Sequence, residues 1–217
     1  MKRLALLLCF AAATIGSLAA NPVTVTFTGA NGQVDANGSG YYISPYSGTI
    51  NGASVTLYCD DDANEVSNGQ TWQANLTSLT SGNLSNTRYG GATNALTLYD
   101  EVAWLTTQYA YPLNSSTDQR NSDIQDTIWN IFNPGKAPTP SNGSYWLTQA
   151  QNNYASISYS NFFIVTNVGP VQPTGQVQEF ITVLTPEPSS MLMLGCGLIA
   201  LSVFARKFIR REQTSRS

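Results

Sequence analysis

The residues Thr-Leu-Tyr-Cys-Asp at positions 56–60 combine β-branched and aromatic side chains, and they predict a strand that ends at Cys59. The chain contains two other cysteines, Cys9 and Cys196, and both lie in terminal segments that have the composition of targeting signals. Cys59 is therefore the one thiol expected in the mature protein, without a partner for an intramolecular disulfide. Such a thiol is either a small buried residue or a group retained for its own chemistry.

The first twenty residues have the organisation of a secretory signal peptide. Lys2 and Arg3 precede an apolar run at 4–15, and the small residues at 17–20 fit a signal-peptidase site. We expect residues 1–20 to be removed on export, which leaves one domain at 21–185 and a C-terminal segment at 186–217.

The composition of residues 21–185 excludes several classes of function. Three positive residues stand against eleven acidic ones, which leaves a net charge of −8. A surface of that sign repels phosphate backbones, so nucleic acid is not an expected partner. The chain also has no histidine, which removes Ser-His-Asp and Cys-His catalysis and the usual zinc sites. We therefore expect a protein that is not an enzyme.

Strand patterns flank a helical middle. Residues 23–28 alternate apolar with polar, residues 41–43 and 49–59 favour strands, and Asn51-Gly52 is a hairpin signal. The polar region 60–91 has room for one short strand. Spacing of three and four residues predicts helices at 97–109 and 123–132, and more weakly at 145–154; strand patterns return at 162–168 and 176–184. The expected fold is α+β, with a sandwich- or barrel-like sheet body and an inserted helical lobe.

The second predicted helix carries a motif that gives Cys59 a chemical partner. Residues 124–129 read Ile-Gln-Asp-Thr-Ile-Trp, so Gln125 and Trp129 lie four residues apart on one side of the helix. This run, together with Tyr58-Cys59, resembles the two motifs of bacterial thioester domains, although Asp60 stands where that family has an apolar residue. The resemblance implies an internal thioester between Cys59 and Gln125, shielded by Tyr58 and Trp129, that attaches the protein to a nucleophile on a surface or matrix partner.

Two other interpretations of these residues stay open. Ser122 and Gln125 have the spacing of a capping box, which would engage the glutamine side chain with a backbone amide. The body would then be a passive, β-rich module associated with matrix or polysaccharide. Asp60, Asp62 and Asn64 are also oxygen-bearing residues at alternate positions, which indicates calcium as a possible ligand, although the later positions depart from the EF-hand pattern.

The C-terminus has three parts in order. Pro186-Glu187-Pro188 is followed by an apolar run at 189–205 and then by the basic residues Arg206, Lys207, Arg210 and Arg211. A run of this length is at the lower limit for spanning a bilayer, with its basic flank in the cytoplasm. The order resembles the PEP-CTERM sorting signal of Gram-negative bacteria. That resemblance implies an exosortase as processing partner, a precursor anchored in the inner membrane by residues 189–205, and a mature protein at the cell surface or outside the cell. A plain membrane anchor is the alternative.

Overall fold

The computed structural model of the chain describes residues 21–110, 118–136, 138–169 and 176–185. Six antiparallel strands close into a barrel in the order β1-β2-β3-β6-β5-β4. Their bounds are β1 Val23–Gly29, β2 Tyr46–Ile50, β3 Ala53–Cys59, β4 Thr71–Ser78, β5 Phe162–Asn167 and β6 Phe180–Val183. The α+β prediction with a barrel-like body is confirmed.

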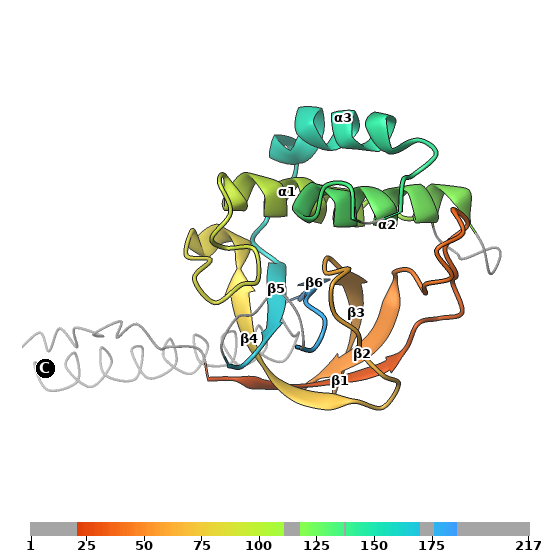
Figure 1. The fold of residues 1–217 in the computed structure, drawn as a ribbon. Coiled ribbons are helices and arrows are strands. Elements are labelled where there is room, and N and C mark those ends of the chain that lie inside the picture. The colour runs from red at the N-terminus through yellow and green to blue at the C-terminus, as the bar shows by residue number, and fades with distance from the viewer. Residues whose placement is uncertain (1–20, 111–117, 137, 170–175, 186–217) are drawn as a thin grey trace, which may run out of the picture.

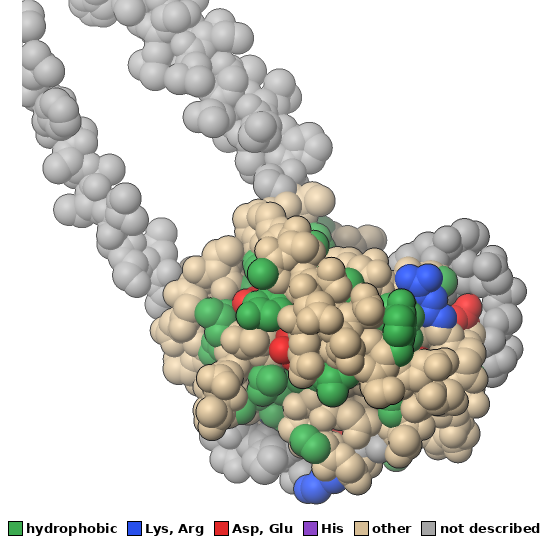
Figure 2. Space-filling view, turned by 90° about the horizontal axis from the view of Figure 1, so that it is seen from above, with side chains coloured by type: hydrophobic (Ala, Val, Ile, Leu, Met, Phe, Trp, Pro, Cys, Tyr) green, Lys and Arg blue, Asp and Glu red, His purple; other side chains and the backbone are tan. Residues whose placement is uncertain are grey.

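Three helices lie between β4 and β5 in the sequence and form a lobe on one side of the barrel (Figure 1). They are α1 Ala95–Thr106, α2 Gln119–Phe132 and α3 Gly143–Asn153, with short 3-10 turns at Leu79–Ser81 and Tyr154–Ser156. Helices α1 and α2 lie next to the barrel, and α3 lies outside them (Figure 1). Viewed from the helical side, the surface consists mostly of uncharged polar groups with scattered apolar side chains (Figure 2).

The barrel is filled from within by alternate residues of its strands. Val25 and Phe27 of β1, Leu57 and Cys59 of β3, and Phe180 of β6 belong to one buried cluster. This period of two is what a sheet with one face toward a core requires. Trp129 of α2 also belongs to the cluster, so this helix contributes an aromatic side chain to the barrel interior.

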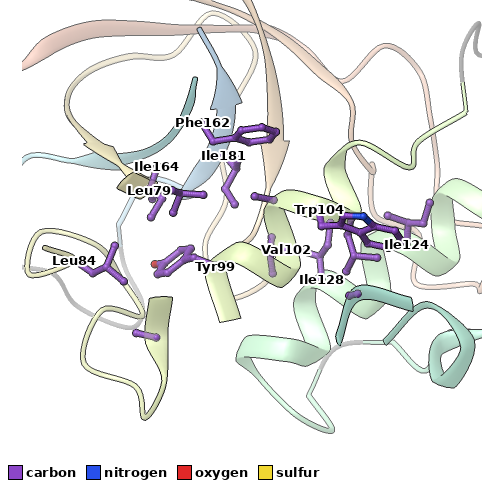
Figure 3. Close-up of a cluster of buried hydrophobic side chains, with 14 of the residues drawn as sticks. Leu79, Leu84, Tyr99, Val102, Trp104, Ile124, Ile128, Phe162, Ile164 and Ile181 are labelled. Atoms are coloured by element: carbon purple, nitrogen blue, oxygen red, sulfur yellow. The ribbon is translucent and has the colours of Figure 1, made fainter. Parts of the chain in front are cut away.

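Strands β5 and β6 are buried on both faces, which is why their sequences are nearly continuous apolar runs. Val165 and Phe180 face the barrel interior, whereas Ile164 and Ile181 belong to the cluster that joins barrel and helices. In that second cluster, Tyr99 of α1 lies close to the side chains of the strands (Figure 3). The helical lobe is therefore held on the barrel by a continuous apolar interface.

The hairpin between β2 and β3 forms where the sequence predicts it. Asn51 and Gly52 both have positive φ, at 50° and 83°, the conformation that a two-residue turn between twisted strands needs. Gly48 in β2 has a different role. A Cβ atom there would lie 2.6 Å from Leu57 Cδ1, so glycine is required for the close approach of this core leucine.

Some predicted elements differ from the structure. Residues 41–43 contribute one isolated bridge, Val34 with Tyr42, instead of a strand, while the polar region 60–91 contains the eight-residue strand β4. Helix α2 begins at Gln119, four residues earlier than predicted, because Asp118 caps it by accepting a hydrogen bond from the Asn121 N–H. None of the helices in the described residues is long and apolar enough to cross a membrane. The predicted signal peptide at 1–20 and span at 189–205 lie outside those residues.

Candidate functional site

Cys59 is the last residue of β3, and no part of it is exposed to solvent. Its backbone N–H donates to Ser44 Oγ at 2.7 Å, and its sulfur lies 3.3 Å from the indole nitrogen of Trp129, which donates to it. The thiol in turn is 3.2 Å from the Asp61 carbonyl oxygen. Burial raises the pKa of the Cys59 thiol well above its usual range, so the sulfur is protonated at neutral pH.

Gln125 is also wholly buried, and its side chain points to Cys59. The amide nitrogen donates to the Cys59 carbonyl oxygen at 2.7 Å. The side-chain oxygen accepts two hydrogen bonds, at 3.0 Å from the Ser44 N–H and at 2.9 Å from the Tyr109 hydroxyl. Three of the four hydrogen bonds that a carboxamide can make are therefore present, and three separate segments supply the partners.

The position of Gln125 in α2 corrects two expectations. Since α2 begins at Gln119, Gln125 lies in the second turn and not in the first. The capping-box interpretation is wrong as well, because Asp118 is the N-cap and the Ser122 hydroxyl instead accepts from the backbone N–H of Ala36. The Gln125 side chain is left to interact with the end of β3.

The arrangement around Gln125 is suited to chemistry at its side-chain carbonyl carbon. Two donors at 2.9 and 3.0 Å on one carbonyl oxygen have the geometry of an oxyanion hole, which holds negative charge as a nucleophile adds. Cys59, whose backbone carbonyl accepts from the Gln125 amide, carries a buried thiol, and the Trp129 indole N–H is placed to stabilise charge on its sulfur. Water is excluded, since Cys59, Gln125 and Trp129 are all at most 2% exposed.

The other predicted neighbour, Tyr58, acts through Tyr109. The two rings lie 5.3 Å apart between centroids, so Tyr58 packs against the residue whose hydroxyl holds Gln125. Sequence reasoning missed Ser44 and Tyr109, because both lie outside the motifs. Tyr109 follows α1, and Ser44 lies in the segment before β2; only the fold brings them to Gln125.

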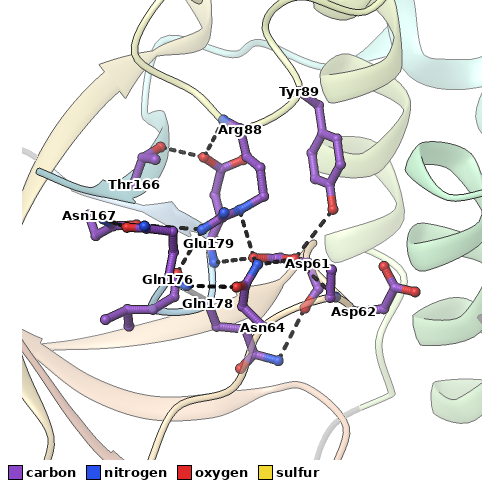
Figure 4. A network of polar contacts seen from close by, with 12 residues as sticks. Asp61, Asp62, Asn64, Arg88, Tyr89, Thr166, Asn167, Gln176, Gln178 and Glu179 are labelled. Atoms are coloured by element: carbon purple, nitrogen blue, oxygen red, sulfur yellow. Dashed lines mark hydrogen bonds and ion pairs between the residues drawn. The ribbon is translucent and has the colours of Figure 1, made fainter. Parts of the chain in front are cut away.

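The acidic residues after Cys59 form part of a buried polar network. Asp61 pairs with Arg88 at 2.7 Å, accepts from the Glu179 N–H at 3.2 Å and receives the Asn64 amide (Figure 4). Glu179 accepts from the Tyr99 hydroxyl at 2.6 Å and from the Arg88 N–H at 2.8 Å. The network links the end of β3, the 85–90 loop and β6.

The three residues considered for calcium have different environments. Asp60 is wholly buried, and neither of its carboxylate oxygens has a hydrogen-bond partner among the described residues. Asp62 accepts from Asn133 Nδ2, whereas Asn64 bonds to Asp61 and to the Gln176 N–H. Within the described residues, no group of three or more Cys, Asp or Glu side chains is placed to hold a metal ion. Calcium binding by these residues stays a prediction.

Burial explains how Asp60 occupies a position that is apolar in thioester domains. It raises the pKa of Asp60 well above the ordinary value, with the Glu179 and Asp61 carboxylates as further causes. This shift favours the neutral carboxyl group, which tolerates a protein interior better than a carboxylate does.

A pocket of about 640 Å³ opens beside this site. Its lining includes the aromatic residues Tyr41, Tyr42 and Trp129 and the acidic residues Asp62 and Glu65. Trp129 is thus shared: one part of its ring system faces the pocket while its N–H reaches the Cys59 sulfur.

A second acidic cluster, Asp123 and Asp126 of α2, binds the 31–42 loop. This loop carries the two tyrosines of the pocket. Asn37 donates to Asp123 and, at 2.8 Å, to Asp126 Oδ2. Asp123 also accepts from the Ser141 N–H at 2.9 Å and from the Asn142 amide at 3.0 Å, so two loops share this anchor. The other carboxylate oxygen of Asp126 is buried without a partner in the described part of the chain.

Comparison with known proteins identifies one region of the chain. Residues 184–211 match the PEP-CTERM protein-sorting motif. No curated protein and no solved structure matches the chain. The motif covers Pro186, Glu187 and Pro188 and the basic residues Arg206, Lys207, Arg210 and Arg211, all outside the residues that the structure describes. It indicates an exported protein of the cell envelope or surface, with an exosortase as its processing partner.

We predict that Asp126 makes the protein less stable as the pH rises. Burial raises the pKa of Asp126 from 3.8 to about 7 in the folded state, so between these values the unfolded chain releases a proton that the folded chain keeps. Its contribution to stability therefore falls across this window, by at most about 1.4 kcal/mol per pH unit. Asp126→Asn should reduce the loss between pH 5 and pH 8, measured by urea unfolding.

The exposed carboxylate of Glu65 lies outside this cluster, so Glu65→Gln is the control. It should leave the change in unfolding free energy between pH 5 and pH 8 as it is in the wild type. Burial also raises the pKa of Glu179 to about 7. Part of the loss of stability with rising pH should therefore be present in every variant. The prediction is contradicted if Asp126→Asn loses as much unfolding free energy between pH 5 and pH 8 as the wild type does.

Proposed function

We propose that Cys59 and Gln125 form an internal thioester and that the protein uses it to attach covalently to a nucleophile on a surface or matrix partner. The observation that carries this proposal is the hydrogen bond from the wholly buried Gln125 amide to the backbone carbonyl oxygen of the wholly buried Cys59, with the Gln125 carbonyl oxygen held by the Ser44 N–H and the Tyr109 hydroxyl. The sorting motif supports it, since it directs the chain to the place where such partners are found.

The chemistry of formation balances within the chain. The Cys59 sulfur adds to the side-chain carbonyl carbon of Gln125, and negative charge builds on the oxygen between the two donors. The carbon–nitrogen bond then breaks, and the nitrogen leaves as ammonia with the thiol proton. The product is a sulfur–carbon bond between the end of β3 and the second turn of α2, with no oxidant or cofactor required.

Opening of the thioester is the attachment step. An amine or hydroxyl adds to the same carbon, the sulfur–carbon bond breaks, and the Cys59 thiol regains a proton. The partner is left joined to the Gln125 side chain by an amide or ester. Because each molecule reacts once, the protein is a covalent adhesin and not an enzyme.

A second candidate, the passive matrix-associated module, is favoured by one observation. Cys59 is a free cysteine in the structure, and the hydrogen bonds of the Gln125 amide are satisfied without a covalent link. In that case Gln125 would be a structural group that fastens the helices to the barrel. The two candidates differ in mass and in reactivity, which the next experiment measures.

We predict that the exported full chain is lighter by one ammonia than its processed sequence, as measured by intact mass spectrometry. Methylamine should add to Gln125, so that the product is heavier than the unmodified sequence by one CH2 group, and it should release one thiol that reacts with a maleimide once the chain is denatured. The matched control is Cys59→Ala, which removes the sulfur and should have the unmodified mass and no adduct. A full-mass wild type with a reactive thiol before treatment would leave the passive module as the function.

Tyr109→Phe should slow opening by methylamine by about 10²- to 10³-fold, because it removes one of two donors on the reacting carbonyl oxygen. The rate is followed as adduct mass against time. Tyr159→Phe is the control, since it removes a phenol that donates to the Asp100 carbonyl oxygen, away from Gln125. If both variants open as fast as the wild type, the Tyr109 hydroxyl does not act on the reaction.

Glu187→Ala should leave uncleaved full-length chain in the membrane fraction, because the variant loses the recognition element but retains the apolar run at 189–205. Immunoblots of membrane and surface fractions measure this. Equal processing of Glu187→Ala and wild type would instead favour a plain anchor.

A further inference from the structure

The pocket beside the Cys59–Gln125 site has the chemistry of a carbohydrate site. Its volume of about 640 Å³ is in the range of pockets that enclose a small organic ligand. Two neighbouring tyrosines of its lining, Tyr41 and Tyr42, are 56% and 58% exposed. Flat aromatic faces that are kept in contact with water suit the apolar faces of pyranose rings, whose hydroxyl groups stay hydrated at the edge.

The charges of the pocket select the kind of sugar. Asp62 and Glu65 contribute carboxylates, and none of the described lining residues is basic. An anionic ligand such as a uronic acid or a phosphate would therefore be repelled, whereas an ammonium group would be attracted by the carboxylates and by the aromatic faces. Asn68, also in the lining, adds an exposed amide that can exchange hydrogen bonds with hydroxyls.

The pocket also has a direct connection to the reactive pair. Trp129 lines it and donates to the Cys59 sulfur at 3.3 Å, and the Tyr41 ring stands perpendicular to Trp129 with centroids 6.2 Å apart. Since Cys59 and Gln125 are wholly buried, a nucleophile reaches the Gln125 carbon only when covering residues move, and Trp129 is a residue that contacts both the pocket and the Cys59 sulfur. A ligand that stacks on Tyr41 is in position to bias that movement.

We propose that this pocket binds amino-sugar units of a polysaccharide and presents their free amine to the Gln125 carbonyl carbon. The inference rests on the proposed thioester for its covalent part, whereas reversible binding in the pocket stands without it. A lysine side chain would leave most of the cavity empty and would contact only one of the two exposed tyrosine rings. A lysine amine, with a pKa of about 10.4, is also almost fully protonated at neutral pH. The amine of a hexosamine is less basic, because the ring oxygens withdraw electrons, so a larger fraction is nucleophilic.

Binding is tested first without the reaction, in the full chain carrying Cys59→Ala. The probes are a glucosamine oligosaccharide, its fully N-acetylated counterpart and Nα-acetyl-lysine amide, each titrated by isothermal calorimetry. We expect saturable binding of the glucosamine oligosaccharide, weaker binding of the N-acetylated form, and none of the lysine derivative. Adding Tyr42→Ala should lower the affinity for the glucosamine oligosaccharide about tenfold, which is a loss of about 1.4 kcal/mol in binding free energy.

The matched control is Tyr145→Ala, which removes an equally exposed tyrosine, 55% accessible, from α3. It should leave the affinity unchanged. Adding Glu65→Gln should lower the affinity for the glucosamine oligosaccharide more than for the N-acetylated form, because only the former carries an ammonium group. Equal affinity for the two oligosaccharides would overturn the amine selection, and binding of the lysine derivative alone would overturn the choice of a sugar.

The covalent step is then tested with the wild-type chain. The glucosamine oligosaccharide should form an adduct on Gln125 at a rate that saturates with concentration, whereas methylamine should show no saturation. Saturable binding to Cys59→Ala without any adduct in the wild type would reject the thioester but keep the pocket. Methylamine adducts without saturable binding of any probe would keep the thioester but overturn the pocket assignment.

Discussion

The buried carboxamide of Gln125 is the interaction on which the relation of barrel and helices depends. Its three partners come from the segment before β2, the end of β3 and the residue stretch after α1. An amide that loses such partners in a protein interior costs about 1–3 kcal/mol for each unsatisfied group. The three contacts therefore fix the position of α2 over the end of β3. The same contacts that satisfy the amide also direct its carbonyl oxygen to two donors, so one arrangement serves both structure and chemistry.

The apolar interface supplies the stability that this polar arrangement requires. Strands β5 and β6 pack against the barrel interior on one face and against the helices on the other, with Ile164 and Ile181 on the helical side. A large buried area offsets the cost of placing Cys59 and Gln125 in a site closed to water. Trp129 belongs to the barrel cluster and to the pocket lining, and so it connects the core with the surface.

The buried acids near the site show how the chain tolerates charge in its interior. Asp61 is compensated by Arg88 and by the Glu179 N–H, and Glu179 receives the Tyr99 hydroxyl. Neither carboxylate oxygen of Asp60 has a hydrogen-bond partner among the described residues, and burial together with its acidic neighbours raises its pKa although Arg88 acts in the opposite direction. Losing the Arg88 partner would leave a buried carboxylate unpaired, which is far more destabilising than losing an exposed pair. The network therefore contributes to the position of β6 beside β3, next to the site.

The sequence by itself determined the local elements and the residues with unusual chemistry. Period-two and period-three-and-four patterns identified most strands and the three helices, and the Asn51-Gly52 pair identified the hairpin. The motif around Gln125 predicts a link to Cys59, and the structure places the Gln125 amide 2.7 Å from the Cys59 carbonyl oxygen. The tertiary structure decided how these parts meet: that six strands close into a barrel, that α2 begins at Gln119 with Asp118 as its N-cap, and that Ser44 and Tyr109 reach Gln125. Local patterns depend on the neighbours of a residue in the chain. Ser44 and Tyr109 are 81 and 16 residues away from Gln125, and contacts over such separations are set by the packing of whole elements.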